Sequence, residues 1–277
     1  MVMLFASLWL LLAPQLAPAT NPGALSFQAT LDAIKINARP AQIVTRQFRL
    51  TLDRNQRPTH FKARVEDWWR SEDGKQSFYE APGTLRRSCG KWVSLNPVES
   101  TVKPGETLVI RIGVALPVEL QAGGFWCALT VDEIPDPLAT QDEGVGVRFV
   151  ASVSTGIFVY VEPVERRATI LGVDVSAGEA QVKVRNEGNV PLAVEGRLEF
   201  FPPGASAPMV TSDVARLTLL TEPSRDGILT STLPPPGALP SGRYRVRAIL
   251  DFGADHYIGA EREVQIVREV QASDPPY

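Results

Sequence analysis

Apolar and polar residues alternate with a period of two along most of the chain that follows its apolar beginning. The alternation is clearest in three segments, Gln42–Leu52, His60–Trp68 and Leu108–Val114. Because successive side chains of a β-strand point to opposite faces, this pattern predicts strands that are buried on one side. Asp73-Gly74 lies between two further strand-like segments and is typical of a hairpin turn. Sustained helical periodicity does not occur, so the sequence predicts an all-β fold.

An internal repeat indicates two domains. Asp53–Pro58 is followed six residues later by Arg-Val-Glu, and Asn186–Pro191 is followed at the same distance by Arg-Leu-Glu. A second match pairs Pro117–Phe125 with Pro236–Tyr244, each placed before a late strand. The first copy is longer between these landmarks, and we assign the extra residues to a hairpin region at Trp68–Arg87. Two tandem immunoglobulin-like β-sandwiches explain both matches better than one large barrel does.

The domain boundaries follow from the same pattern. Glu162–Ala168 interrupts the strand-like sequence with a proline and is expected to link the two sandwiches. The first sandwich is expected over residues 20–163 and the second over residues 164–270. Residues 271–277 are rich in proline and are expected to form a disordered tail.

Residues 1–19 are expected to be a cleaved signal peptide. Met3–Leu12 is apolar apart from Ser7, and Ala17–Ala19 offers small residues at a cleavage site. The apolar run is shorter than the roughly 20 residues that a membrane-spanning helix needs. An uncleaved apolar anchor is the alternative interpretation. We expect no membrane span in the mature chain and a periplasmic or extracellular location.

Export changes the interpretation of the two cysteines, Cys89 and Cys127. In an oxidising compartment an even pair has one possible connectivity, and we expect a disulfide. A bridge that closes a loop of this length stabilises the fold by about 3–4 kcal/mol in the chain-entropy treatment. Two buried free thiols are the alternative.

Composition argues against several classes of function. The formal net charge is −3 and there is no long basic run, so we expect no nucleic-acid partner. The two histidines, His60 and His256, lie apart from each other and from the cysteines, without the spacing of a zinc site or a catalytic triad. We therefore expect no catalytic residues, no metal, no cofactor and no enzymatic activity. One acidic segment is interpreted as a solvated loop or as a weak site for calcium or a basic partner: Asp132, Glu133, Asp136, Asp142 and Glu143.

Adjacent aromatic residues form a candidate binding surface. Trp68 and Trp69 are neighbours, so on a strand their rings point to opposite faces, and Tyr79 lies across the predicted hairpin. An exposed member of Trp68, Trp69 and Tyr79 could hold a sugar ring or a partner protein. The alternative is that a neighbouring strand or domain covers these rings.

The first predicted sandwich resembles the amino-terminal domain of the periplasmic pilus-assembly chaperones, the PapD-like immunoglobulin sandwiches. The resemblance covers residues 27–163 and rests on Ile34–Ile36, Phe48–Asp53, Pro58, Ala63–Trp68, Trp92–Pro97, Lys103–Ile112, Phe125–Pro135 and Phe149–Pro163. The second sandwich is similar to a generic bacterial immunoglobulin-like module, on the basis of Asn186–Pro191 and Leu239–Gly253.

The resemblance implies a mechanism of strand lending. In that family an exposed late strand with alternating apolar residues is lent to an incomplete pilus subunit, so that backbone hydrogen bonds bind and alternate side chains select. The matching residues of this sequence are Val145, Val147, Phe149, Ala151 and Val153. The same pattern also fits an ordinary strand that faces the core.

The resemblance also implies an anchor for a partner's terminal carboxylate. The chaperones use an arginine and a lysine; the arginine corresponds to Arg39, whereas the position of the lysine corresponds to Phe158. The expected function is non-enzymatic binding of another exported protein, such as a pilin-like or surface subunit. An envelope or surface adhesion module that binds glycans through exposed aromatic rings is the alternative.

Overall fold

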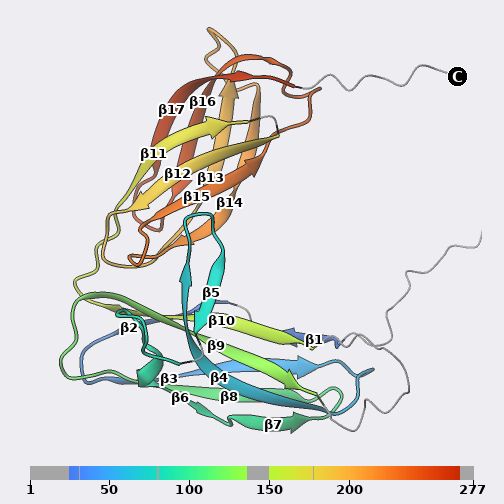
Figure 1. The fold of residues 1–277 in the computed structure, drawn as a ribbon, viewed down its shortest axis with the longest axis vertical. Helices are drawn as coiled ribbons and strands as arrows, with labels where there is room; N and C mark the ends of the chain where they lie inside the picture. The colour runs from blue at the N-terminus through green and yellow to red at the C-terminus, as the bar shows by residue number, and fades with distance from the viewer. Residues whose placement is uncertain (1–24, 31, 80, 136–149, 177, 269–277) are drawn as a thin grey trace, which may run out of the picture.

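The computed structural model describes residues 25–30, 32–79, 81–135, 150–176 and 178–268. Figure 1 shows two stacked β-sandwiches, the lower built from β1–β10 and the upper from β11–β17. Within these ranges the only helix is a short 3-10 turn, η1 (Gly90–Trp92). The all-β prediction of two immunoglobulin-like sandwiches is confirmed. The predicted signal peptide (1–19) and tail (271–277) lie outside the described residues.

The first sandwich consists of two sheets. One sheet has the order β1 (Phe27–Ala29), β3 (Ile43–Leu52), β8 (Thr107–Ala115) and β6 (Val93–Asn96). The other has the order β2 (Ile34–Ala38), β10 (Ser152–Val161), β9 (Gly123–Ile134), β4 (Thr59–Arg70) and β5 (Gln76–Tyr79), and β7 (Glu99–Val102) also pairs with β4. The pairing of β2 with β10 is parallel, whereas the other pairings are antiparallel. The chain therefore crosses from one sheet to the other between β1 and β2.

The second sandwich repeats this plan with fewer strands. Its three-stranded sheet has the order β11 (Ala168–Val175), β12 (Glu179–Asn186) and β15 (Asp226–Thr232). Its four-stranded sheet has the order β14 (Val210–Leu219), β13 (Leu192–Phe201), β16 (Gly242–Asp251) and β17 (Ile258–Ile266). The two copies of the repeated motif occupy equivalent corners, Asp53–Pro58 between β3 and β4 and Asn186–Pro191 between β12 and β13.

The predicted disulfide is present. Cys89 and Cys127 are bonded, with their Cα atoms 5.3 Å apart, and both are fully buried. Cys127 lies in the middle of β9, and Cys89 precedes η1. The bridge therefore fastens the long connection after β5 to the central strand of its sheet.

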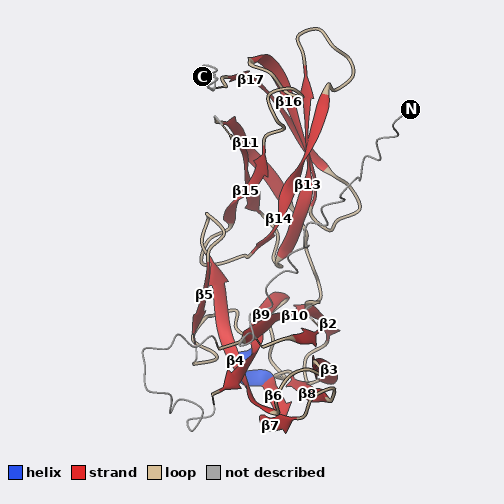
Figure 2. Ribbon diagram, turned by 90° about the vertical axis from the view of Figure 1, so that its right-hand side faces the viewer, coloured by secondary structure: helices blue, strands red, loops and turns tan. Residues whose placement is uncertain are grey.

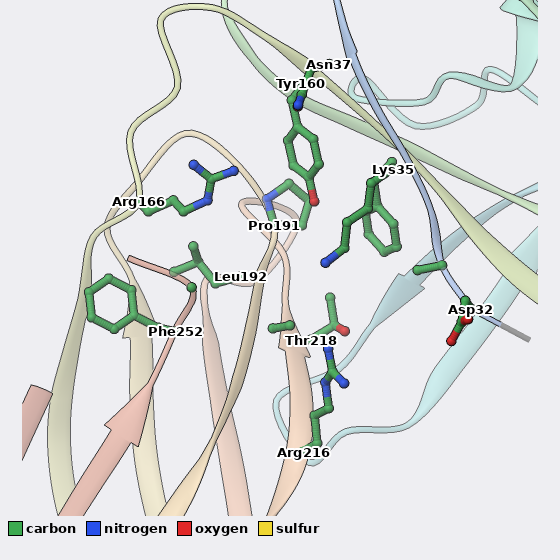
Figure 3. A pocket seen from close by; sticks show the side chains of 14 residues that line it. Asp32, Lys35, Asn37, Tyr160, Arg166, Pro191, Leu192, Arg216, Thr218 and Phe252 are labelled. Atoms are coloured by element: carbon green, nitrogen blue, oxygen red, sulfur yellow. The ribbon is translucent and has the colours of Figure 1, made fainter. Parts of the chain in front are cut away.

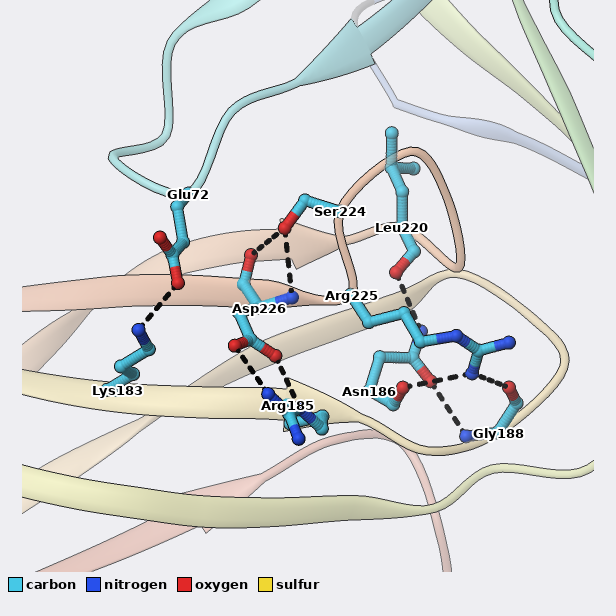
Figure 4. Close-up of polar contacts among 9 residues, drawn as sticks. All are labelled: Glu72, Lys183, Arg185, Asn186, Gly188, Leu220, Ser224, Arg225 and Asp226. Carbon is cyan, nitrogen blue, oxygen red and sulfur yellow. Dashed lines mark hydrogen bonds and ion pairs between the residues drawn. The ribbon is translucent and has the colours of Figure 1, made fainter.

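The predicted hairpin reaches the second sandwich. The turn at Asp73-Gly74 joins β4 to β5, and Gly74 has a φ of 85°, in the left-handed region that favours glycine. Figures 1 and 2 show this hairpin rising from the lower sandwich to the base of the upper one. There the backbone N–H of Ile228 donates to the carbonyl of Glu72 at 2.9 Å, and the Glu72 carboxylate pairs with Lys183 at 2.6 Å (Figure 4).

A second junction lies at the start of β9. The N–H of Gly124 donates to the carbonyl of Asn189 at 2.8 Å. A Cβ atom at Gly124 would lie 2.3 Å from Cδ of Pro191, so only glycine fits at this close approach. Apolar side chains of the first sandwich, among them Trp126 and Phe158, join the buried cluster of the second. The two sandwiches therefore share a continuous apolar interface.

Candidate functional site

The first half of β10 forms an open sheet edge. All of Ser152–Val161 pairs with β9 on one side, but β2 pairs on the other side only with Ile157–Val161. Beyond β2, the hydroxyl of Thr155 donates to the carbonyl of Asp32 at 3.0 Å. Within the described ranges, Ser152–Ser154 has no second strand partner. An unpaired edge of this kind can accept a strand from another chain.

The predicted partner-binding strand lies only partly in the described residues. Val145, Val147 and Phe149 lie outside them. Val153 packs against the core of the first sandwich. The N–H of Ala151 donates to the Glu133 carboxylate at 3.2 Å. These two positions fit a lent strand and an ordinary core-facing strand equally well.

A large cavity lies between the two sandwiches, beside the end of β2. Its volume is about 710 Å³, and its walls come from β2, β10, the linker, and the β13, β14 and post-β16 regions of the second sandwich. Lys35 lies opposite Phe158 in the parallel pairing, and both residues line the cavity. Figure 3 shows the Lys35 amine and the Tyr160 hydroxyl pointing into the same space.

Cationic groups dominate the lining of this cavity. Lys35, Arg166 and Arg216 line it, against one acidic residue, Asp32. In the part of the chain that the structure describes, neither Lys35 nor Arg166 has an acidic group within 4 Å, whereas Arg216 lies 3.7 Å from Glu195. The cavity is therefore suited to an anion such as a carboxylate.

Tyr160 forms part of the same wall. Burial raises the pKa of its hydroxyl, and the nearby Arg166 opposes this effect. The Arg166 guanidinium lies 5.6 Å from the centre of the Tyr160 ring, within the range of a cation–π contact. Tyr160 therefore offers the cavity a neutral hydroxyl, which can donate a hydrogen bond to an anion.

The position of Arg39 differs from that of the cavity cations. Arg39 lies in the turn after β2, where its N–H donates to the Gln42 side-chain oxygen at 3.0 Å, and it does not line the cavity. Phe158, the position matched to the family's lysine, does line it. The cation next to that position comes from Lys35 on the adjacent strand. Sequence reasoning missed Lys35, although its place in the alternating segment Ile34–Ala38 already put it on the polar face.

The candidate aromatic residues separate into a buried ring and an exposed pair. Trp68 is 4% exposed, and its indole N–H donates to the carbonyl of Cys127 at 3.2 Å. Trp69 is half-buried and donates to the hydroxyl of Tyr79 at 2.9 Å, and Tyr79 is 41% exposed. The glycan alternative therefore depends on Trp69 and Tyr79. A glycan array probed with the protein and with Trp69→Ala tests it, and a signal that survives the substitution would contradict it.

The acidic segment is engaged by neighbouring groups where the structure describes it. Burial alone would raise the pKa of Asp132, but hydrogen bonds from Arg64 and Ser152 outweigh it and lower that pKa. Glu133 is buried and lies 3.9 Å from Arg57. Asp136, Asp142 and Glu143 lie outside the described residues. Within the described ranges, no group of three or more His, Cys, Asp or Glu side chains could hold a metal ion, and no helix is long and apolar enough to cross a membrane.

Comparison with known proteins finds similarity at the level of the fold. No family model and no curated protein matches the chain. A crystal structure of the YadV chaperone matches 86% of this chain and 99% of its own, with 14% identity and a TM-score of 0.45. The class 5 fimbriae chaperone CfaA matches 86% of this chain and 99% of its own, with 10% identity and a TM-score of 0.47. The CsuC–CsuE complex of chaperone and tip adhesion subunit, from Csu pili of Acinetobacter baumannii, matches 88% and 100%, with 15% identity and a TM-score of 0.46.

Proposed function

We propose that this protein is an exported, non-enzymatic binding module that holds the carboxyl-terminal segment of another exported protein by β-strand addition. The observation that carries the proposal is the open edge of β10 beside a cationic cavity. The partner that fits is a pilin-like or surface subunit with an extended, apolar end.

The open edge supplies the first part of this interaction. A segment that pairs with Ser152–Ser154 gains backbone hydrogen bonds, which do not depend on its sequence. The neighbouring strand β2 already occupies the second half of β10, so the added segment extends the sheet rather than displacing a strand.

The cavity supplies the second part. Lys35 belongs to β2, which pairs with the second half of β10, and its side chain projects into the space between the sandwiches (Figure 3). A terminal carboxylate there receives charge-assisted hydrogen bonds, which are roughly twice as strong as neutral ones. Lys35 thus provides the anchoring charge that the pilus chaperones place at the position matched to Phe158.

The test uses short peptides with free carboxyl ends, selected from a display library on the purified protein. We expect amidation of the terminal carboxylate to weaken binding of a selected peptide about tenfold, because one charge-assisted bond is lost. In Lys35→Met the acid and amide forms should bind nearly equally, whereas the exposed control Lys103→Met should keep the difference. Calorimetric titration of both peptide forms into the wild type and the two variants measures all six values.

N-methylation of the peptide backbone tests strand addition independently of the carboxylate anchor. Methyl groups on alternate amides that face β10 should abolish binding, whereas methyl groups on the intervening amides should be tolerated. Equal binding of the acid and amide forms would contradict the carboxylate anchor. Indifference to the position of methylation would contradict strand addition.

A further inference from the structure

A second, smaller cavity adjoins the large one. Its volume is about 190 Å³, and it shares Ala33, Phe158 and Thr218 with the large cavity. A cavity of about 150 Å³ holds a benzene molecule in another protein. The smaller cavity therefore has room for one side chain of a bound segment.

Aromatic rings form much of its wall. Trp68 lies opposite Phe78 in the pairing of β4 with β5, and the Trp68 and Phe158 rings meet edge to face at 6.0 Å. Phe78 is 42% exposed, which is unusual for a ring of this size. Gly156 lies on the same face, where a Cβ atom would approach the Phe158 ring to 2.7 Å. The absence of a side chain at Gly156 avoids this collision, and Gly156 adds no atoms beyond its backbone to the wall of the cavity.

Arg70 adds a charge to the smaller cavity. Its Nη1 atom donates to the carbonyl of Gly74 at 2.9 Å, but its Nε atom is buried and has no acceptor. In the described residues, Arg70 has no acidic group within 4 Å. Asp226, which lines an adjoining crevice with Arg70, is held by Arg185 through two hydrogen bonds of 2.6 and 2.9 Å (Figure 4).

This environment is unfavourable for a guanidinium without an anion. Burial lowers the pKa of Arg70, since the charged form loses contact with water. Arg70 is half-buried, and its guanidinium lies 6.0 Å from the centre of the Trp68 ring. Charges that lose hydration in folded proteins are normally paired, because the loss is otherwise not offset. A carboxylate with a short apolar stem would satisfy both the charge and the aromatic walls.

We propose that the smaller cavity binds an acidic side chain, best a glutamate, of the segment added to β10. Ser154 connects the two sites, because it belongs to the open edge and also lines this cavity. Side chains of an added strand alternate between the two faces of the sheet, so one set lies over the face that carries Trp68 and Arg70. The inference rests on the proposed function: Lys35 holds the main-chain terminus, and Arg70 selects a side chain nearby.

The cavity can be tested without a partner. The probe is N-acetyl-glutamate amide, and N-acetyl-glutamine amide is the matched neutral control. We expect the Nε–Hε cross-peak of Arg70 in a nitrogen–proton correlation spectrum to move on addition of the glutamate compound, with binding about tenfold tighter than for the glutamine compound. The cross-peak is assigned by its loss in Arg70→Lys, or by through-bond experiments on the wild-type protein should that variant not fold. An Arg70 cross-peak that does not move, or that responds equally to both compounds, would overturn the proposal.

Selected peptides separate this inference from the proposed function. Peptides that bind should carry an acidic residue at one fixed position before the terminus, and its change to glutamine should weaken binding about tenfold in the wild type but not in Arg70→Gln. Dependence on the terminal carboxylate without any acidic preference would overturn this inference alone. Loss of the terminal carboxylate effect, with Arg70 still responding to the glutamate compound, would overturn the proposed function and leave the acid-binding cavity standing.

Discussion

The same corner of the sandwich is used in two different ways in this molecule. In the first sandwich, Asp53–Pro58 is exposed or half-buried, with no close approach to the other domain among its hydrogen bonds in the described residues. In the second sandwich, Asn186–Pro191 is packed against the start of β9. Asn186 is fully buried, and its amide donates to the carbonyls of Val190, Leu219 and Leu220. Its side-chain oxygen accepts from the N–H of Gly188, and Figure 4 shows this contact beside the one with Leu220.

The comparison shows that the two sandwiches are stabilised by different kinds of interaction. The second sandwich is stabilised by the buried hydrogen bonds of Asn186, in the corner that meets the first sandwich. The first sandwich is stabilised by a covalent bridge inside its own core. Because the bridge lies in the core, it covers no part of the outer surface of the first sandwich. The open edge of β10 and both cavities lie at that surface.

Removal of the disulfide should have the largest effect. The bridge links residues separated by 38 positions, and in the chain-entropy treatment it contributes about 4 kcal/mol to the free energy of unfolding. Cys89→Ala with Cys127→Ala should therefore lower the urea midpoint of the first sandwich strongly. Tryptophan fluorescence follows unfolding of the first sandwich together with loss of its contact with the second, because the described tryptophans all belong to the first sandwich and Trp68 and Trp126 pack at the interface. An unchanged midpoint would show that the bridge is not what fastens the first sandwich.

Truncation of the corner amide should come next. Asn186→Ala leaves three carbonyls and one N–H without their partner in a buried place, and we expect a loss of about 3 kcal/mol. The matched change Asp53→Ala in the other corner removes only the hydrogen bond from Ser26 to a half-buried carboxylate and should cost no more than about 1 kcal/mol. Urea unfolding followed by far-ultraviolet circular dichroism measures both variants. Similar losses in the two would remove the distinction between the corners.

The smallest effect should appear on acidification. Hydrogen bonds from Arg185 lower the pKa of Asp226, on an edge of the second sandwich near the hairpin. A carboxylate with a lowered pKa in the folded state stabilises the fold above its unfolded value of about 3.9, and this stabilisation is lost as the pH falls through the folded pKa. Unfolding free energies measured from neutral pH to about pH 3 should decline less in Asp226→Asn than in the wild type. Parallel curves for the two proteins would contradict this assignment.

The sequence-based predictions succeed where the determining interactions are local. Alternation places the strands, Asp73-Gly74 places the hairpin turn, and a single pair of cysteines allows only one intramolecular bridge. The corner repeat likewise places two equivalent connections, because proline restarts the chain in the same way in both copies.

The candidate site could not be predicted in the same way, since it depends on non-local pairing. Lys35 faces the large cavity because β2 runs parallel to β10, and nothing near Lys35 in the sequence indicates that partner. Alternation shows that Trp68 and Trp69 face opposite ways, but only the second sandwich decides which ring is covered. The cavity beside Arg70 likewise depends on the packing of the two sandwiches, because Thr218 of β14 forms part of its wall.

The hairpin formed by β4 and β5 has a thermodynamic consequence for any ligand of the cavities. By joining Glu72 to Ile228 and Lys183, it holds the second sandwich in position before a partner arrives. Both cavities have walls from the two sandwiches, so a swinging domain would have to be ordered during binding, with a loss of entropy. In this protein that ordering takes place during folding, so the hairpin should increase the affinity of the proposed segment beyond what its own contacts at the smaller cavity contribute.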